Sequence, residues 1–199
     1  MAEPVDPEIR RLFEERKAFD NAMLGMLHAW SHLENNLALL LGSIVRDGAG
    51  SLASAIYFAP NSFEVRKQVV EAAMFIVCEP FDQDGSIRRL WGNWSSKIDK
   101  NKKVRNQVAH GQIITHAVNG KNRIRLCPPL FNFGHYAVAH KKRQLPGYSA
   151  HDIEQSARSL SHNTEATWIF RDMINACIFQ KPQALPEISQ KLELHLKQI

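Results

Sequence analysis

The chain has 199 residues, of which 44% are hydrophobic and 23% are charged, and its net charge is +5. This length suits one domain, and this composition excludes a disordered or fibrous protein. The longest nearly continuous apolar stretch, residues 37–45, is far shorter than the ~20 residues that cross a bilayer, so no membrane contact is expected.

The first half of the chain reads as a series of helices. Residues 6–46 have helical periodicity that starts at Asp6-Pro7. The pattern fits either one continuous helix or two helices with a break near Asp20. A short helix is predicted over residues 51–58. A third helix begins at Asn61 or Ser62 and extends to about Glu79, and a fourth extends from Asp84 to Gly111.

A β-hairpin is predicted directly after the fourth helix, over about residues 112–127. The runs 112–118 and 121–127 flank Asn119-Gly120, the dipeptide most typical of a two-residue hairpin turn. Such a turn pairs Val118 with Lys121, and it continues to the pairs His116–Arg123 and Ile114–Arg125. The hairpin then has one apolar face and one basic face.

A loop over residues 128–148 and a final long helix over residues 149–179 complete the predicted fold. The fold class is all-α: a helical bundle with one small hairpin after the fourth helix. Residues 1–181 form a single domain. Residues 182–199 form a C-terminal tail, and the sequence does not decide whether this tail contains a last short helix.

The positive charge is concentrated in one segment. Residues 100–151 hold ten basic residues and no acidic one, whereas the rest of the chain has 15 basic and 20 acidic residues. Such a segment suits a polyanion such as RNA, DNA or a nucleotide, although a solvated basic face is an equal alternative. The candidate substrate-binding residues are Lys102, Lys103, His116, Arg123, Arg125, Lys141, Lys142 and Arg143.

Three side chains with suitable chemistry lie within six residues at the end of the fourth helix. Arg105 can bind a phosphate with its planar guanidinium, and His110 can transfer a proton near neutral pH. Asn106 lies about 40° from His110 around the helix and could orient the imidazole ring. Arg105, Asn106 and His110 are therefore the candidate catalytic residues.

This segment resembles the signature of HEPN-domain proteins, in which an arginine and a polar residue are followed by three residues and a histidine. Trp30 with Leu33-Glu34 and Leu37 is similar to the first long helix of that family. The Ala109-His110-Gly111 ending, the hairpin, Pro128-Pro129 and the closing helix follow the same order. The resemblance covers about residues 20–180.

The resemblance implies a HEPN-like helical bundle that forms a homodimer. It also implies a metal-independent endoribonuclease, with a toxin or phage-defence role, in which the RNA 2′-hydroxyl attacks the adjacent phosphate. Arg105 would neutralise the phosphate, His110 would act as general acid or base, and Asn106 would orient. Gln112 departs from the tyrosine found there in toxins paired with a nucleotidyltransferase antitoxin, which argues against that partner.

Two other readings stay open. The chain could be a catalytically inactive HEPN-like module that binds a protein or nucleic acid, or a small basic nucleic-acid-binding protein outside the family. Arg105 could also be structural, because Glu34 lies among apolar residues and needs a cationic partner.

The remaining expectations concern the cellular setting and the cofactor. Three widely spaced cysteines predict neither a disulfide framework nor a cysteine-based zinc site, and they suit the cytoplasm. The first eleven residues lack the apolar core of a secretory signal. No metal or cofactor is predicted, and the identity of any antitoxin or other protein partner is left open.

Overall fold

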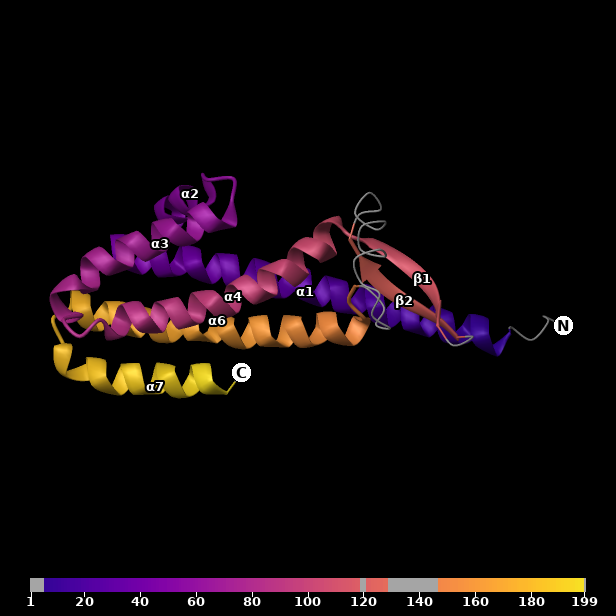
Figure 1. Ribbon diagram of the computed structural model, residues 1–199. Helices are drawn as coiled ribbons and strands as arrows, with labels where there is room; N and C mark the ends of the chain where they lie inside the picture. The colour runs from indigo at the N-terminus through magenta and orange to yellow at the C-terminus, as the bar shows by residue number, and fades with distance from the viewer. Residues whose placement is uncertain (1–5, 119–120, 129–146, 199) are drawn as a thin grey trace. The chain divides into compact units, whose positions relative to one another are not determined.

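The computed structural model describes residues 6–118, 121–128 and 147–198. Within these residues, α-helices dominate and two antiparallel strands form a small sheet, which confirms the predicted all-α fold with one hairpin (Figure 1). Each of the described helices is too short or too polar to cross a membrane.

The helices lie close to their predicted positions. Two short 3₁₀ segments, η1 and η2, precede α4 and α7. In chain order the helical elements are α1 (Pro7–Val45), α2 (Ser51–Phe58), α3 (Phe63–Cys78), η1 (Glu79–Phe81), α4 (Ser86–His110), α6 (Ala150–Ile178), η2 (Pro182–Ala184) and α7 (Leu185–Lys197).

Local hydrogen bonds explain where several helices begin and continue. Helix α1 runs without a break through Asp20, whose carboxylate lies 3.0 Å from the guanidinium of Arg16 one turn earlier. Ser62 caps α3 by accepting a hydrogen bond from the backbone of Val65. Ser149 and Asp152 form a reciprocal capping box at the start of α6.

The hairpin has the predicted register. Strands β1 (Gln112–Val118) and β2 (Lys121–Cys127) pair Val118 with Lys121 and continue to Gln112 with Cys127. On the predicted apolar face, Ile124 and Leu126 are buried, while Arg123 on the opposite face is exposed. A two-residue connection sets the register because only one pairing is compatible with so short a turn.

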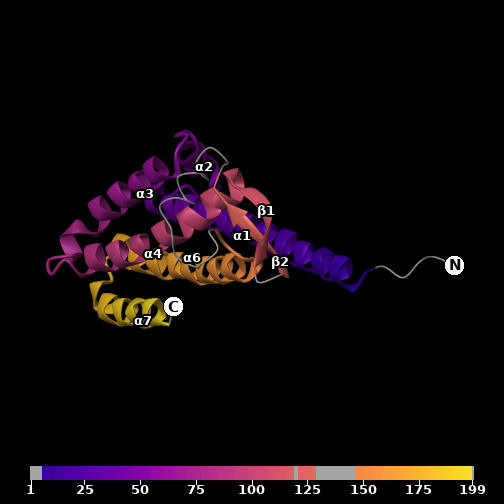
Figure 2. The same cartoon turned by 45° about the vertical axis from the view of Figure 1, so that its right-hand side comes forward.

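The chain divides into two compact units, and α1, α4 and α6 contribute to both. The first unit comprises Met1–Trp30 and Lys100–Arg158. In this unit the hairpin lies beside α1, as Figures 1 and 2 show. Arg11 donates to the backbone oxygen of Asn122 over 2.9 Å, and the backbone amide of Ile124 donates to Glu15 over 3.2 Å. These two bonds satisfy backbone groups on the outer edge of strand β2 that have no partner in β1.

The second unit comprises Ser31–Asp99 and Ser159–Ile199. An aromatic cluster forms part of its core: Trp91 and Trp94 are fully buried, with ring centroids 5.2 and 5.9 Å from that of Phe170. The indole of Trp94 donates to the backbone oxygen of Asn163. Helix α7, in the stretch predicted as a tail, buries Leu192 and Leu196 in this unit.

Candidate functional site

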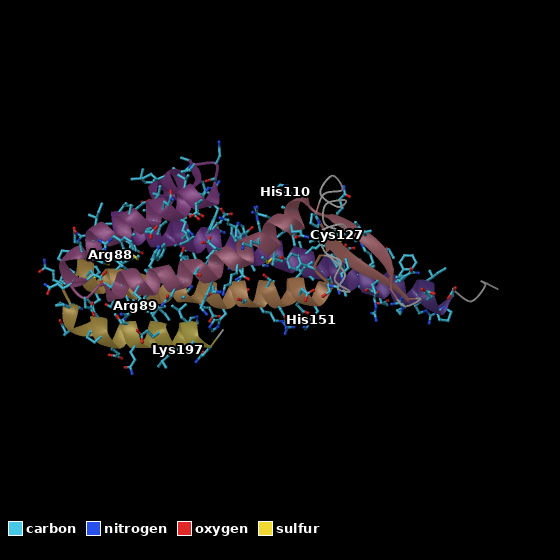
Figure 3. The ribbon with its side chains drawn as sticks, in the orientation of Figure 1. Arg88, Arg89, His110, Cys127, His151 and Lys197 are labelled. Carbon is cyan, nitrogen blue, oxygen red and sulfur yellow. The ribbon has the colours of Figure 1, made fainter. Side chains whose placement is uncertain are left out.

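The three candidate catalytic residues lie in the last two turns of α4, within the first unit. Val104 and Val108 are 9% and 6% exposed, so they direct one face of this segment into the core. Asn106 and His110 are exposed and Arg105 is half-buried. His110 is the last residue of the helix, where α4 leads into strand β1 (Figure 3).

The corner where α4 leads into strand β1 is held by close contacts with the backbone of strand β2. The side-chain amide of Gln107 donates to the backbone oxygen of Leu126 over 2.9 Å. A side chain at Gly111 would place its Cβ 2.5 Å from the Gln107 oxygen and 2.7 Å from the Cys127 oxygen. Only glycine permits this close approach, and the corner therefore fixes the position from which His110 projects.

A second segment closes the same corner. Tyr148 exchanges two backbone hydrogen bonds with Leu126, at 2.9 and 3.0 Å. Gly147 precedes it with a φ of +87°, and a Cβ there would collide with the Leu126 oxygen. This clamp lies in the stretch 128–148 that we predicted as a loop, and the sequence offered only the Pro146-Gly147 pair as a turn signal.

Arg105 is positioned by an aromatic ring rather than by a carboxylate. Its guanidinium carbon lies 5.3 Å from the ring centroid of Trp30, which is 3% exposed. One terminal nitrogen donates to Oδ1 of Asn106 over 3.2 Å, and Nε is buried without a hydrogen-bond partner. No carboxylate among the described residues forms an ion pair with Arg105, so its charge is available to an anion.

The Arg105–Asn106 bond also orients the amide. Because Oδ1 of Asn106 accepts from Arg105, its NH₂ group is left as a donor on the exposed side. We predicted that Asn106 would orient His110. The structure instead gives it a partner in Arg105, and the two residues together present hydrogen-bond donors, which suit phosphate oxygens.

Glu34 has a different partner from the one we considered. Its carboxylate lies 2.6 Å from a terminal nitrogen of Arg66 within the second unit, and both side chains are less than one-fifth exposed. The need of this buried carboxylate for a cation is therefore met by Arg66. Glu34 gives no reason to treat Arg105 as structural.

The candidate substrate-binding residues fall into distinct environments. Arg125 is half-buried and lies 3.3 Å from Asp152. Burial raises the pKa of Asp152, but hydrogen bonds from Ser149 and the charge of Arg125 outweigh this effect, so the pKa lies below its ordinary value. Arg125 therefore has a structural role at the start of α6.

Only some of the other candidate residues have side chains within the described part of the structure. Arg123 and Lys103 are exposed, and Lys102 is half-buried with interactions of its own. The backbone of His116 lies in β1, and its side chain is outside the described part. Three further candidates lie wholly outside the described residues: Lys141, Lys142 and Arg143.

The contact of Trp30 with Arg105 is the feature of the candidate site that sequence reasoning missed. We named Trp30 for its similarity to the first long helix of the HEPN family, and in the structure this residue is buried. Its role as a platform for Arg105 depends on a contact between residues 75 positions apart, which helical periodicity cannot reveal.

One group of side chains in the second unit could offer ligands to a metal ion. Candidate atoms of His162, Glu165 and His195 lie within 4.8 Å of one another. The two imidazole rings are stacked with centroids 3.9 Å apart and planes 6° from parallel. An ion bound by a histidine nitrogen lies in the plane of that ring, so the rings would have to turn before both could bind one ion.

Comparison with protein-family models, with curated proteins and with solved structures finds no match to this chain.

Proposed function

We propose that this protein is a metal-independent endoribonuclease of the HEPN type, with a toxin or phage-defence role in the cytoplasm. The observation that supports this best is the pairing of Arg105 with Asn106 beside an exposed histidine. A half-buried guanidinium on Trp30, with no carboxylate partner among the described residues, is suited to a phosphate. His110 projects from the same helix and supplies the group that transfers protons.

The reaction follows from these roles. The RNA 2′-hydroxyl attacks the adjacent phosphorus, and the bond from phosphorus to the 5′ oxygen breaks. The products are a 2′,3′-cyclic phosphate and a free 5′-hydroxyl. One imidazole removes the 2′ proton and another protonates the leaving oxygen, while Arg105 stabilises the added negative charge on the phosphate oxygens.

Two imidazoles require two subunits, because each chain supplies one such motif. Helix α1 offers a surface for a partner in the unit that holds Arg105. In the part of α1 that belongs to this unit, the large apolar residues that are exposed fall within about 60° around the helix, and they are Ile9, Phe13, Leu24 and Leu27, with exposures of 47, 70, 68 and 39%. We propose a symmetric homodimer that covers this stripe and brings the two motifs together.

The decisive experiment incubates a mixed RNA pool with wild type and two variants in the presence of EDTA. Wild type is expected to cleave, and His110→Ala is expected to lose about 10²–10⁴-fold in rate. His151→Ala is the matched control, because His151 is also an exposed histidine at a helix end in the first unit (Figure 3). A 2′-deoxy substitution at the cut site should abolish cleavage.

The alternative is an inactive module that binds a protein or nucleic acid, and the same experiment separates the two. If wild type and His110→Ala leave the RNA equally intact over a range of pH, the nuclease proposal fails. Light scattering tests the assembly separately: a monomer at micromolar concentration would contradict the two-subunit site.

A further inference from the structure

A pocket of about 490 Å³ opens in the second unit. The end of α1 and the following turn supply one wall, and the end of α6 supplies the other. The residues that give the pocket its chemical character are Leu39, Arg46, Asp47, Arg171, Asn175 and Phe179.

Arg171 lies in this pocket with an unsatisfied donor. Its guanidinium carbon is 4.1 Å from the ring centroid of Trp168, which holds the planar group in place. Its Nε is buried and has no hydrogen-bond partner, and no described carboxylate forms an ion pair with it. A buried N–H group without a partner is uncommon in folded proteins and marks a place where a partner is expected.

Arg46 contributes a second positive charge from an unusual backbone position. It follows the last residue of α1 with a φ of +56°, and Asp47 donates to the backbone oxygen of Gly42 to close the helix end. Glycine is the usual residue at this position because it adopts positive φ without strain. An arginine at this position strains the backbone, and a contact between its exposed side chain and a ligand would explain why arginine occurs there instead of glycine.

Asp47 does not cancel these two charges. Its carboxylate accepts a hydrogen bond from the backbone amide of Ala53 over 3.0 Å, at the start of α2. Backbone hydrogen bonds, led by that from Ala53, lower the pKa of Asp47 below its ordinary value. The carboxylate is therefore committed to capping α2, and the pocket keeps a net positive charge.

We propose that this pocket binds a small organic phosphate monoester. The phosphate lies between the guanidinium groups of Arg46 and Arg171, with the side-chain amide of Asn175 as a further donor. The organic part packs on Leu39 and on the ring of Phe179, which is 68% exposed and would be covered by it. This proposal does not depend on the nuclease activity.

Phenyl phosphate is the probe, and isothermal titration calorimetry of the full chain is the measurement. Wild type is expected to bind it saturably, and Arg171→Gln and Arg46→Gly should each weaken binding about tenfold or more. Arg46→Gly also removes the backbone strain, so a loss of binding by this variant cannot be attributed to misfolding.

Arg88→Gln is the matched control. Arg88, labelled in Figure 3, also lies over an aromatic ring, with 4.4 Å to the centroid of Phe75, and it is not one of the residues that line the pocket. Unchanged affinity in this variant, and weaker binding of inorganic phosphate than of phenyl phosphate, support the proposal. It is overturned if Arg46→Gly and Arg171→Gln bind like wild type, if Arg88→Gln weakens binding equally, or if inorganic phosphate binds as tightly as phenyl phosphate.

Discussion

The imidazole rings of His162 and His195 are stacked, and each ring nitrogen Nε2 faces the backbone oxygen of the other residue, at 3.1 and 2.9 Å. Since a carbonyl oxygen only accepts, both rings carry a proton on Nε2. The pair therefore joins α6 to α7 through two reciprocal hydrogen bonds in the second unit.

His195→Ala removes the stacking and the hydrogen bond that the His195 ring donates, while the His162 ring keeps the backbone oxygen of residue 195 as its acceptor. We expect the free energy of unfolding to fall by about 1–3 kcal/mol, measured by urea denaturation. Lys197→Ala is the control, since Lys197 is exposed at the end of the same helix (Figure 3). Equal midpoints for the two variants would show that the histidine pair does not secure α7.

Arg66→Ala and Arg105→Ala should have opposite profiles. Arg66→Ala leaves Glu34 largely buried without its cation, so we expect a loss of about 2–3 kcal/mol in stability. Arg105→Ala leaves no described carboxylate unpaired, so the protein should keep its stability while losing RNA cleavage. Thermal unfolding and a cleavage assay on both variants check this contrast. A large drop in melting temperature for Arg105→Ala would restore a structural role for that residue.

The features that the sequence predicts correctly are those that depend on residues close together in the chain. The helices and the hairpin register are encoded by neighbouring residues: a capping Ser62, the Asn119-Gly120 dipeptide in the sequence between the two strands, and apolar residues at regular spacing. These could be predicted because each signal acts within one element.

Contacts between distant residues could not be predicted in this way. We named Arg105 as the candidate partner of Glu34, and no spacing rule favours the actual partner Arg66, which lies 32 positions away. The Trp30 platform and the Gly147–Tyr148 clamp depend in the same way on how the elements pack. Arg105, Asn106 and His110 could be named as candidates from the sequence, whereas the groups that hold Arg105 in place could not.

Gly147→Ala should destabilise the corner beside His110. A side chain at a φ of +87° is strained, and its Cβ would collide with the Leu126 oxygen. We expect a loss of about 1–3 kcal/mol in unfolding free energy, together with reduced cleavage. Gly25→Ala is the matched control: it lies in α1 with nothing near the added methyl group, and it should stabilise the protein by up to about 1 kcal/mol.

The Asp152 carboxylate, which accepts hydrogen bonds from Ser149 and forms an ion pair with Arg125, should make a pH-dependent contribution to stability. Because the pKa of Asp152 is lower in the folded protein than its ordinary value of 3.8, this contribution is complete above that value. It is lost as the pH falls below 3.8 toward the folded pKa. The stability difference between wild type and Asp152→Asn should therefore shrink as the pH is lowered from 6 through 3.8. A difference that stays constant or grows would contradict this assignment.

Arg123 and Arg125 should differ in their effect on RNA binding. Arg123→Ala removes an exposed cation, and we expect weaker binding and a salt dependence reduced by about one unit of slope. Arg125→Ala should mainly lower stability, since its charge is committed to Asp152. Filter binding over a series of salt concentrations measures both effects, and equal losses in slope would show that Arg125 also contacts RNA.

The bond between Arg105 and Asn106 makes the site sensitive to the replacement of one nitrogen by one oxygen. Conversion of the Asn106 amide to a carboxylate, by mutation or by spontaneous deamidation, would put a negative charge 3.2 Å from the guanidinium. The arginine would then be neutralised by its own neighbour, and an incoming phosphate would be repelled. Under the proposed function, this single change in the amide of Asn106 would inactivate the site at the end of α4 without altering the fold.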